Sequence, residues 1–310
     1  MTKDTAAILF NPSAGKGKAI GMKDRVEACL RRHGVPYDLF VTGSEGELKA
    51  LAGEHAMTYA TVVGAGGDST FHLIVNEIVK AGAVARFGMI GAGSSNDIGR
   101  EFDVDSLEKA CRTLKRGRIR RVDLGHIVRG GETLRYYLGQ ANVGLGAQVN
   151  RYVDALARRK PALGRRQTLA GVLGIIRSYR SGILPLSLTM DSEAGTVRGE
   201  FIAAVFSNIR YWATGKLIAP EARPDDGTLD ACLIGMCSFG RLARIARLAG
   251  KGRHGTMKEV RFLRSSSFEV SSETPFEVQA DGEIIGGAEC PETFERVAFK
   301  VFPRALDLVC

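Results

Sequence analysis

The sequence lacks a hydrophobic run long enough for a membrane span. No stretch approaches the ~18–20 apolar residues that such a span needs, and the first residues lead into no hydrophobic signal segment. Both absences favour a cytoplasmic protein. With 310 residues, 45% of them hydrophobic and 25% charged, the chain has the composition of a globular protein and the length for two domains, each with its own core.

Cysteine is scarce as well. We interpret the six cysteines as scattered, without CxxC pairs or nearby histidine partners. Isolated thiols of this kind are typical of a reduced, cytoplasmic protein in which most of them are buried. We therefore expect neither a zinc site nor a disulfide framework.

Two common nucleotide-binding motifs are absent too. The turn Asn11–Lys18 does not match the P-loop pattern GxxxxGK[ST], because Phe10 stands where the first glycine belongs and Gly17 follows Lys16. No glycine loop matches GxGxxG followed by an acidic residue at the Rossmann distance. A nucleotide site in this chain would therefore belong to another class.

The chain does contain a strand, a glycine loop and a helix twice in succession, between Thr61 and Asp97. The two loops read Gly64-Ala65-Gly66-Gly67-Asp68-Ser69-Thr70 and Gly91-Ala92-Gly93-Ser94-Ser95-Asn96-Asp97. Backbone N–H groups at such loops point at the bound group, and the dipole of the following helix favours negative charge. Two such loops in tandem predict a site for the phosphates of a nucleotide.

The N-terminal part of the chain alternates strands and helices, which predicts a mostly parallel sheet with helices on both faces. In such sheets the ligand lies beyond the carboxyl ends of the strands, where the glycine loops fall. We expect strands at 6–10, 37–41, 61–63 and 87–90, and helices around 26–30, 47–55 and 105–116.

After residue 121 strand-like runs dominate, and turn signals such as Asp226-Gly227 and Asp281-Gly282 separate them. This pattern predicts an antiparallel second domain. We expect its strands at 122–128, 134–138, 184–190, 196–205, 229–234, 267–271, 276–280 and 297–301. The predicted domains are 1–123 and 124–291, with 292–310 as a tail that packs back on the first.

Positive charge is concentrated in two segments. Residues 151–182 and 241–264 each hold eight Lys and Arg against one acid, so the rest of the chain is net acidic although the total is +9. Both segments also have apolar residues at helical spacing. The segments Arg158–Arg180 and Arg241–Arg264 are thus candidates for docking on an anionic membrane surface, whereas a solvated face on a core helix is the plainer interpretation. Nucleic acid is not expected, because aromatic residues are not interleaved with the charges.

Six ordered motifs give the chain a family resemblance. They are Asn11-Pro12-Ser13-Ala14-Gly15-Lys16, Gly66-Gly67-Asp68-Ser69-Thr70, Gly93-Ser94-Ser95-Asn96-Asp97, Asn142-Val143-Gly144-Leu145-Gly146, Ala219–Gly227 and Asp281-Gly282-Glu283. In this order they resemble the diacylglycerol kinase catalytic-domain family, which includes bacterial lipid kinases and the sphingosine and ceramide kinases. The resemblance implies an N-terminal three-layer α/β domain similar to phosphofructokinase and NAD kinase. It also implies a C-terminal antiparallel β-sandwich domain and an active site between the two.

The resemblance also implies an ATP- and Mg²⁺-dependent kinase that phosphorylates a hydroxyl of a diacylglycerol-like lipid. Asp281 resembles the base that accepts the lipid hydroxyl's proton, and Asp68 would help to place Mg²⁺. A structural Mg²⁺ would be held near Arg223, Asp226 and Thr228. The nucleotide-binding residues that it implies are Asn11, Thr42, Gly66, Gly67, Asp68, Ser69, Thr70, Ser94, Asn96, Asp97 and Glu283.

Simpler interpretations exist for several of these residues. Asp-Gly between strands is a strong hairpin signal, so Asp281 and Asp226 could be turn residues alone. Asn96-Asp97 could be a helix N-cap, and we expect the pair to cap a helix and bind nucleotide at once. Ser69 departs from the family's usual glycine, and serine would cost of order 1 kcal/mol there if the position needs a positive φ.

Two other functions stay open from the sequence. One is a soluble kinase similar to the NAD kinases, and the other is a catalytically weak, lipid-binding regulatory protein, which the altered loop at Ser69 would suit. For the favoured lipid kinase we expect peripheral membrane association in the cytoplasm and leave open a homodimer.

Overall fold

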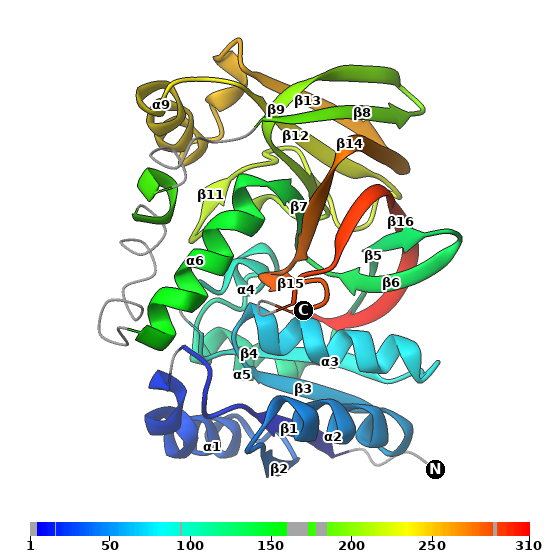
Figure 1. Ribbon diagram of the computed structural model, residues 1–310. Helices are drawn as coiled ribbons and strands as arrows, with labels where there is room; N and C mark the ends of the chain where they lie inside the picture. Colours follow the sequence, from blue (N-terminus) through cyan, green and yellow to red (C-terminus); the bar gives the residue numbers. More distant parts are fainter. Residues whose placement is uncertain (1–4, 16, 94, 160–172, 178–184, 288–289) are drawn as a thin grey trace. The chain divides into compact units, whose positions relative to one another are not determined.

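The computed structural model describes residues 5–15, 17–93, 95–159, 173–177, 185–287 and 290–310 (Figure 1). Its contacts divide the chain into two compact units, one running to Leu124 and including Pro303–Cys310, the other spanning Gly125–Phe302. The domain limits predicted from the sequence stay a prediction. Within the described ranges, none of the helices combines the length and apolar character that crossing a membrane would take.

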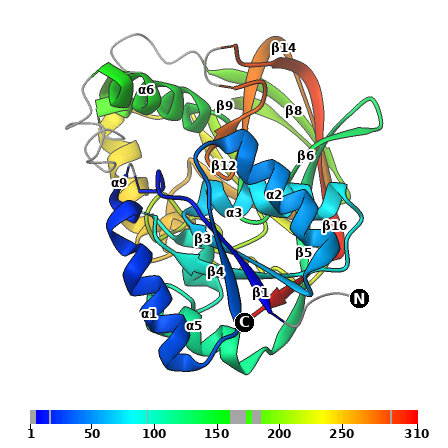
Figure 2. The same ribbon diagram turned by 90° about the horizontal axis from the view of Figure 1, so that it is seen from below.

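Unit 1 is built on a parallel sheet. Its elements are β1 (Ala6–Phe10), a 3-10 turn (Lys18–Met22), α1 (Lys23–His33), β2 (Tyr37–Val41), α2 (Glu45–Thr58), β3 (Thr61–Gly66), α3 (Asp68–Lys80), β4 (Arg86–Gly91), α4 (Asp97–Glu101) and α5 (Leu107–Arg116). The strand order is β4-β3-β1-β2. α1 packs with α5 and α2 packs with α3, on opposite faces of the sheet (Figure 2). The three-layer α/β architecture is confirmed.

Local sequence explains why the helices of unit 1 begin and end where they do. The Ser44 hydroxyl accepts the N–H of Glu47, whose carboxylate accepts the N–H of Gly43, so the two residues cap α2 reciprocally. Gly34 and Gly117 follow α1 and α5 with φ of 64° and 62°, a left-handed conformation that glycine adopts without strain. These boundaries fix where each parallel strand starts and where its loop opens.

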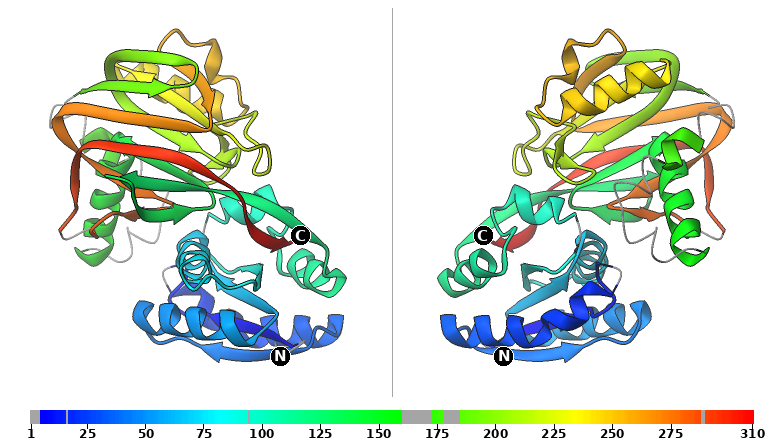
Figure 3. Two further views of the ribbon diagram at one scale, coloured as in Figure 1. Left: turned by 90° about the vertical axis from the view of Figure 1, so that its right-hand side faces the viewer. Right: turned by 90° about the vertical axis from the view of Figure 1, so that its left-hand side faces the viewer.

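Unit 2 is an antiparallel β structure (Figure 3). Its elements are β5 (Ile119–Arg129), β6 (Glu132–Tyr137), β7 (Gln140–Gly144), α6 (Leu145–Arg159), β8 (Leu186–Ser192), β9 (Gly195–Ser207), β10 (Tyr211–Trp212), β11 (Lys216–Leu217), β12 (Leu229–Gly235), α9 (Phe239–Ala249), a 3-10 turn (His254–Thr256), β13 (Val260–Ser265), β14 (Ser267–Ala280), β15 (Glu283–Ile284) and β16 (Thr293–Val309). β5 and β16 are the strands in which the chain passes from one unit to the other. Along unit 2 the order is β13-β12-β9-β7-β14-β16, and β8 pairs with both β9 and β14.

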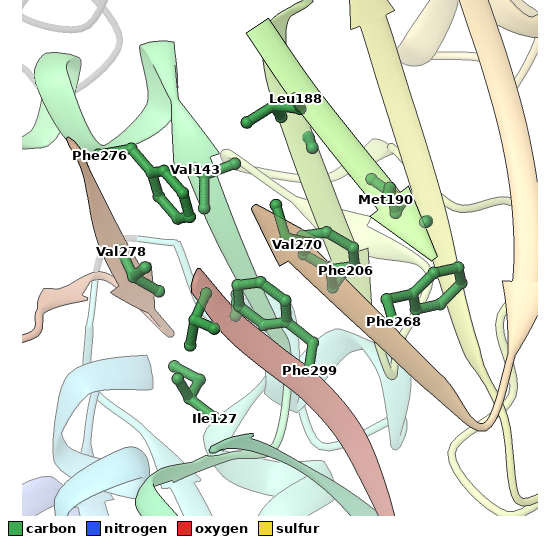
Figure 4. Packing of buried hydrophobic residues seen from close by; sticks show 14 of the residues in the cluster. Ile127, Val143, Leu188, Met190, Phe206, Phe268, Val270, Phe276, Val278 and Phe299 are labelled. Carbon is green, nitrogen blue, oxygen red and sulfur yellow. The ribbon is translucent and has the colours of Figure 1, made fainter. Parts of the chain in front are cut away.

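The core of unit 2 is apolar and rich in phenylalanine (Figure 4). Phe206 of β9 stacks on Phe299 of β16 with ring centroids 4.0 Å apart, and Phe268 of β14 lies 5.4 Å from Phe206. Three strands thus contribute rings to one cluster, and each buried ring removes a large apolar area from water. The β-sandwich class predicted for the C-terminal domain is confirmed.

Two predictions about elements of unit 2 need correction, and a strand beside Asp281 was missed. The segment 241–264 is helical only to Ala249, because α9 ends there and Val260–Ser265 is strand β13. The two strands expected at 267–271 and 276–280 are one strand, β14, with a register irregularity between Ser271 and Phe276. β7 was not predicted, although all five of its residues are buried.

Candidate functional site

The glycine loops of unit 1 meet at one edge of its parallel sheet. Asn11 follows β1, Thr42 follows β2, and Gly67 and Ala92 follow β3 and β4, so all four lie at carboxyl ends of the strands. The main chain ties them together, since the N–H of Asn11 donates to Ala65 and the N–H of Thr42 donates to Phe10. This is the edge at which α/β sheets bind ligands.

The two tandem loops touch each other through their backbones. A Cβ added at Gly93 would lie 2.5 Å from the Cα of Gly67, and one added at Gly67 would lie 3.2 Å from the Cα of Gly93. The N–H groups of Ala92 and Gly93 both donate to the carbonyl of Gly66. Because no side chain intervenes, the loops form one continuous backbone surface beside the start of α3, which is the arrangement that lets phosphate approach N–H groups.

The Asp68 side chain links the same two loops through hydrogen bonds. Its carboxylate accepts the N–H of Asp97 at 3.1 Å and the N–H of Ile98 at 3.2 Å, so it caps α4 from the neighbouring loop. Asn96, which we expected to cap this helix, occupies the N-cap position with φ 49° and makes no side-chain capping bond. Asp68 caps α4 instead, because its carboxylate is within hydrogen-bond distance of the N–H groups of Asp97 and Ile98. Asp97 itself is buried, 5% exposed.

Ser69 is the second residue of α3 and is exposed, and its φ is not positive. The anticipated strain of a serine at this position is therefore absent, since helical backbone suits any L-residue. The N-cap of α3 is Gly67, which has no side chain to offer, so the first N–H groups of the helix lack a side-chain cap.

Asn11 and Thr42 hold the loops in position. The Asn11 amide donates to the Thr70 hydroxyl at 2.9 Å, and its oxygen accepts the N–H of Ser13 at 3.0 Å. The buried Thr42 hydroxyl donates to the carbonyl of Phe10 at 3.2 Å. Ser94 lies outside the described residues.

In unit 2, Asp281 occupies a tight hairpin turn between β14 and β15. Asp281 and Gly282 have φ of 47° and 97°, the positive pair that a two-residue type I′ turn requires. Both oxygens of its carboxylate are engaged by backbone donors: Oδ2 accepts the N–H of Leu138 at 2.8 Å, and Oδ1 accepts those of Gly139 and Gln140 at 2.8 and 2.9 Å. The side chain is thus fixed in place, 7% exposed, and Glu283 pairs with Ala280 across the turn.

Buried polar side chains that were not predicted from the sequence gather on the strands next to Asp281. The Asn142 amide of β7 donates to Gln279 of β14 at 2.9 Å, and Gln140 of β7 faces Ser207 of β9 in the sheet register. Among the described residues, Gln140 Oε1, Asn142 Oδ1 and Ser207 Oγ have no hydrogen-bond partner although they are buried. The only local signal was the Asn142 motif, to which we had given no role.

The Tyr137 hydroxyl is a further buried group near Asp281. It has no hydrogen-bond partner among the described residues, and a Cβ at Gly125 would lie 2.5 Å from its oxygen. Burial and then the negative charge of Asp281 raise the pKa of Tyr137. The phenol therefore stays neutral, and Gly125 is required to make room for it.

The residues proposed for a structural cation form an exposed turn after β11. Asp226 Oδ1 accepts the N–H and the hydroxyl of Thr228, at 3.1 and 2.7 Å, while Arg223 lies 3.9 Å from Asp225. Burial raises the pKa of Asp230, the hydrogen bond and the charge of Arg264 lower it, and the charges of Asp226 and Glu221 raise it further, so these groups lie close enough to interact. One carboxylate with backbone oxygens and water is a set that suits Mg²⁺. The residues therefore fit the ion.

The basic residues of Arg241–Arg264 divide into paired and unpaired sets. Arg241 forms an ion pair with Glu259, and Arg264 donates to Asp230 at 3.0 Å. Arg244 and Arg247 are exposed on α9 and, among the described residues, have no ion-pair partner. Most of Arg158–Arg180 lies outside the described residues; within it, Arg177 lies over the ring of Tyr152 at 5.7 Å.

A basic cavity of about 510 Å³ opens beside α9. Arg198 of β9 and Lys258 and Arg261 near the start of β13 line it, together with the Arg241–Glu259 pair. Arg198, Lys258 and Arg261 are exposed and form no ion pair among the described residues. The cavity is therefore suited to anions.

Taken together, the fold and the site define a class of two-domain protein in which an α/β unit with tandem glycine loops is joined to a β-sandwich. The family model of the diacylglycerol kinase catalytic domain matches residues 5–127, and that of the YegS C-terminal NAD kinase beta sandwich-like domain matches residues 139–310. The chain belongs to the diacylglycerol kinase catalytic-domain family and is a lipid kinase of that family.

Relatives and solved structures agree over the whole chain. A diacylglycerol kinase of Staphylococcus saprophyticus is 24% identical over 297 residues, 93% of this chain and 91% of that protein. A diacylglycerol kinase of Staphylococcus haemolyticus is 25% identical over 298 residues, 93% of this chain and 84% of that protein. The crystal structure of a diacylglycerol kinase from Bacillus anthracis matches with a TM-score of 0.71 at 15% identity, covering 100% of this chain and 98% of the other. Another from that organism has a TM-score of 0.77 at 17% identity, with 100% and 96% covered.

Proposed function

We propose that this protein transfers the γ-phosphoryl group of ATP to a hydroxyl of a diacylglycerol-like lipid, in a Mg²⁺-dependent reaction at a membrane surface. The observation that carries the proposal is the direct contact between the Gly67 and Gly93 backbones beside the start of α3. A side chain at either position would meet the backbone of the other loop and push the two loops apart, which would displace the N–H groups that a phosphate needs. The relatives named diacylglycerol kinase supply the lipid class of the acceptor.

The residues of unit 1 bind and neutralise the triphosphate in this proposal. The backbone of Gly66–Thr70 donates to phosphate oxygens, and the dipole of α3 adds positive potential there. Asp68 and Asp97 would hold Mg²⁺, which neutralises phosphate charge when bound. Asp68 suits the role of a Mg²⁺ ligand because its hydrogen bonds to the first N–H groups of α4 fix the position of its carboxylate.

The residues of unit 2 act on the acceptor. Asp281 accepts the proton of the attacking lipid hydroxyl, and its three backbone hydrogen bonds orient it for that transfer. Gln140, Asn142 and Ser207 support a polar headgroup site, because their buried oxygens need donors or acceptors that an apolar core does not provide. A glycerol hydroxyl has that chemistry.

Labelled ATP tests the reaction directly. The protein is incubated with Mg²⁺ and either diacylglycerol-containing vesicles or NAD, and the lipid and nucleotide fractions are then separated. Label in the lipid fraction that disappears with a chelator supports the proposal. Label in NADP would instead make the protein a soluble NAD-kinase-like enzyme, and label in neither would make it a lipid-binding protein without kinase activity.

Membrane docking is proposed to use the unpaired basic residues near α9. Arg244 and Arg247 lie one turn apart on its exposed side, while Leu242 and Ile245 are buried beneath. Three apolar side chains before, at the start of and after α9 are also exposed: Met236, Phe239 and Phe262, at 44%, 42% and 38%. Exposed cations beside exposed apolar groups suit the interface of an anionic bilayer.

Vesicle binding distinguishes docking from a solvated face. Each arginine near an anionic surface contributes about 1 kcal/mol, so Arg244→Gln with Arg247→Gln should weaken binding to phosphatidylglycerol vesicles by roughly 30-fold. The matched control is Arg112→Gln with Arg116→Gln, which removes the same charge from the exposed side of α5. The loss should shrink at high salt. Equal losses in both double variants would mean that only net charge matters and would refute docking through α9.

A further inference from the structure

Three side chains from two helices of unit 1 bring metal-binding atoms together, away from the glycine loops. The Sγ of Cys29, a ring nitrogen of His33 and a carboxylate oxygen of Glu108 all lie within 4.8 Å of one another. His33 Nε2 is 3.0 Å from Glu108 Oε2. Cys29 is buried, His33 is half-buried and Glu108 is exposed, so the group is open to solvent on one side.

Helix geometry explains the convergence. Cys29 and His33 are four residues apart on α1, and residues at that spacing project from the same face, one turn apart. Glu108 lies in the first turn of α5, which packs against α1 (Figure 2). The expectation that no cysteine has a nearby histidine partner was wrong, because the spacing Cys29-x-x-x-His33 is present in the sequence.

The surroundings of the three atoms already accommodate positive charge. The Arg32 guanidinium donates to Cys29 Sγ at 3.5 Å and forms an ion pair with Glu108. The thiol of Cys29 lies 3.8 Å from the carbonyl of Leu107. A second thiol, Cys111, is buried on α5 and forms a hydrogen bond with Cys29.

We propose that Cys29, His33 and Glu108 form a binding site for a zinc-type divalent cation, with water as the fourth ligand. Thiolate, imidazole and carboxylate are the ligands that Zn²⁺ takes, and three protein ligands with one open position is an established arrangement. With metal–ligand distances of about 2.0–2.3 Å, tetrahedral ligands lie about 3.3–3.8 Å apart. The three atoms lie within 4.8 Å of one another, so metal binding requires them to draw together by roughly 1 Å.

The neighbours then serve as the outer shell of the site. Cys111 forms a hydrogen bond with the Cys29 sulfur, whereas Arg32 would give up its contact with Cys29 when the ion binds. One thiolate and one carboxylate balance the two charges of the cation. A bound ion would join α1 to α5, and the site would be independent of the proposed kinase reaction.

Cobalt(II) provides a spectroscopic test on the full chain. The protein is reduced, treated with chelator, desalted and titrated with Co²⁺, whose thiolate bond gives a charge-transfer band and whose tetrahedral geometry gives strong visible bands. We expect both sets of bands in the wild type and their loss in Cys29→Ser and in His33→Ala. Cys111→Ser should weaken binding by about tenfold, as outer-shell changes do.

Arg32 and a second cysteine supply the discriminating controls. Arg32→Gln removes a cation that competes for Cys29 and should tighten Co²⁺ binding by about two- to fivefold, in line with an exposed ion pair. Cys290→Ser removes an exposed thiol outside the cluster and should change nothing.

Three results would overturn the site: no charge-transfer band in the wild type, bands that persist in His33→Ala, or bands that vanish in Cys290→Ser. The half-buried His33 keeps the test decisive if the buried Cys29→Ser change impairs folding. The thermal midpoint gives a second readout, because Zn²⁺ should raise it in the wild type and leave it unchanged in His33→Ala.

Discussion

Substituting Asp281 tests the chemistry and the architecture of unit 2 at once. Its carboxylate receives the N–H groups of three successive residues, Leu138, Gly139 and Gln140, at 2.8 to 2.9 Å. Any replacement of Asp281 therefore changes the hydrogen bonding of these three N–H groups as well as the ability of the side chain to accept a proton. Asn and Ala differ in a useful way, because Asn keeps one acceptor oxygen and tolerates the φ of 47° at this turn.

The stability cost of each variant follows from the number of N–H groups left without a partner. A buried donor without an acceptor costs about 1–3 kcal/mol. In Asp281→Asn the remaining oxygen can serve Gly139 and Gln140, so only Leu138 loses its partner and the cost should be about 1–3 kcal/mol. Asp281→Ala leaves three donors and should cost about 3–9 kcal/mol, which approaches the whole stability of a typical domain.

Urea unfolding and steady-state kinetics separate the two effects. Folded Asp281→Asn should lose about 10²- to 10⁴-fold in turnover with an unchanged KM for ATP, because a general base acts on the acceptor. Asp191→Asn is the matched control: its exposed carboxylate accepts one side-chain bond, from Thr196, and stability should change by less than about 0.5 kcal/mol. Turnover within a few fold of the wild type in folded Asp281→Asn would refute the base. A loss of under about 1 kcal/mol in Asp281→Ala would refute the hydrogen-bond argument.

Three further substitutions have defined outcomes. Gly93→Ala forces two backbones apart, so it should lower the free energy of unfolding by about 1–3 kcal/mol and weaken ATP binding in calorimetry. Gly53→Ala is the control, because an added Cβ there meets nothing within 4 Å and stability should stay the same or rise. Equal changes in stability in the two variants would contradict the contact between the loops. Ser69→Gly should preserve turnover and cost about 0.5 kcal/mol of stability, and a large loss of turnover would mean that the hydroxyl binds nucleotide. Burial lowers the pKa of His254, so the unfolded chain binds a proton that the folded chain does not. Stability should therefore fall below pH ~6.5 by at most about 1.4 kcal/mol per pH unit for this group, and the slope should decrease in His254→Gln.

Much of unit 1 was predictable because its signals are local. The strands at 6–10 and 37–41 have the predicted bounds, since short apolar runs followed by turn residues leave few alternatives. The same holds for the hairpin at Asp281, whose Asp-Gly pair selects the turn. Each of these features is encoded within about ten residues.

Features that depend on distant residues were not predictable in this way. β7 consists of Gln-Ala-Asn-Val-Gly, a sequence of low strand propensity that becomes a strand because β9 and β14 pair with it on both sides. β13 has Arg261 and Arg264 at a spacing that also suits a helix, and its pairing with β12 decides the outcome. In both cases tertiary pairing overrides the local pattern.

Asp68 and Asp281, the two acidic residues proposed to act in the reaction, both accept hydrogen bonds from backbone N–H groups that are distant in the sequence. Asp68 accepts two backbone N–H groups 29 and 30 residues away, and Asp281 accepts three at 141 to 143 residues. A carboxylate held by several N–H groups has a fixed position and orientation, which suits a cation ligand and an oriented proton acceptor. The same hydrogen bonds link segments that are distant in the sequence. An alanine variant of either residue could therefore lose activity because it loses a catalytic group or because it is less stable. Asp281→Asn keeps most of the hydrogen bonds from the backbone while it removes the negative charge. It is therefore the substitution that identifies a catalytic role.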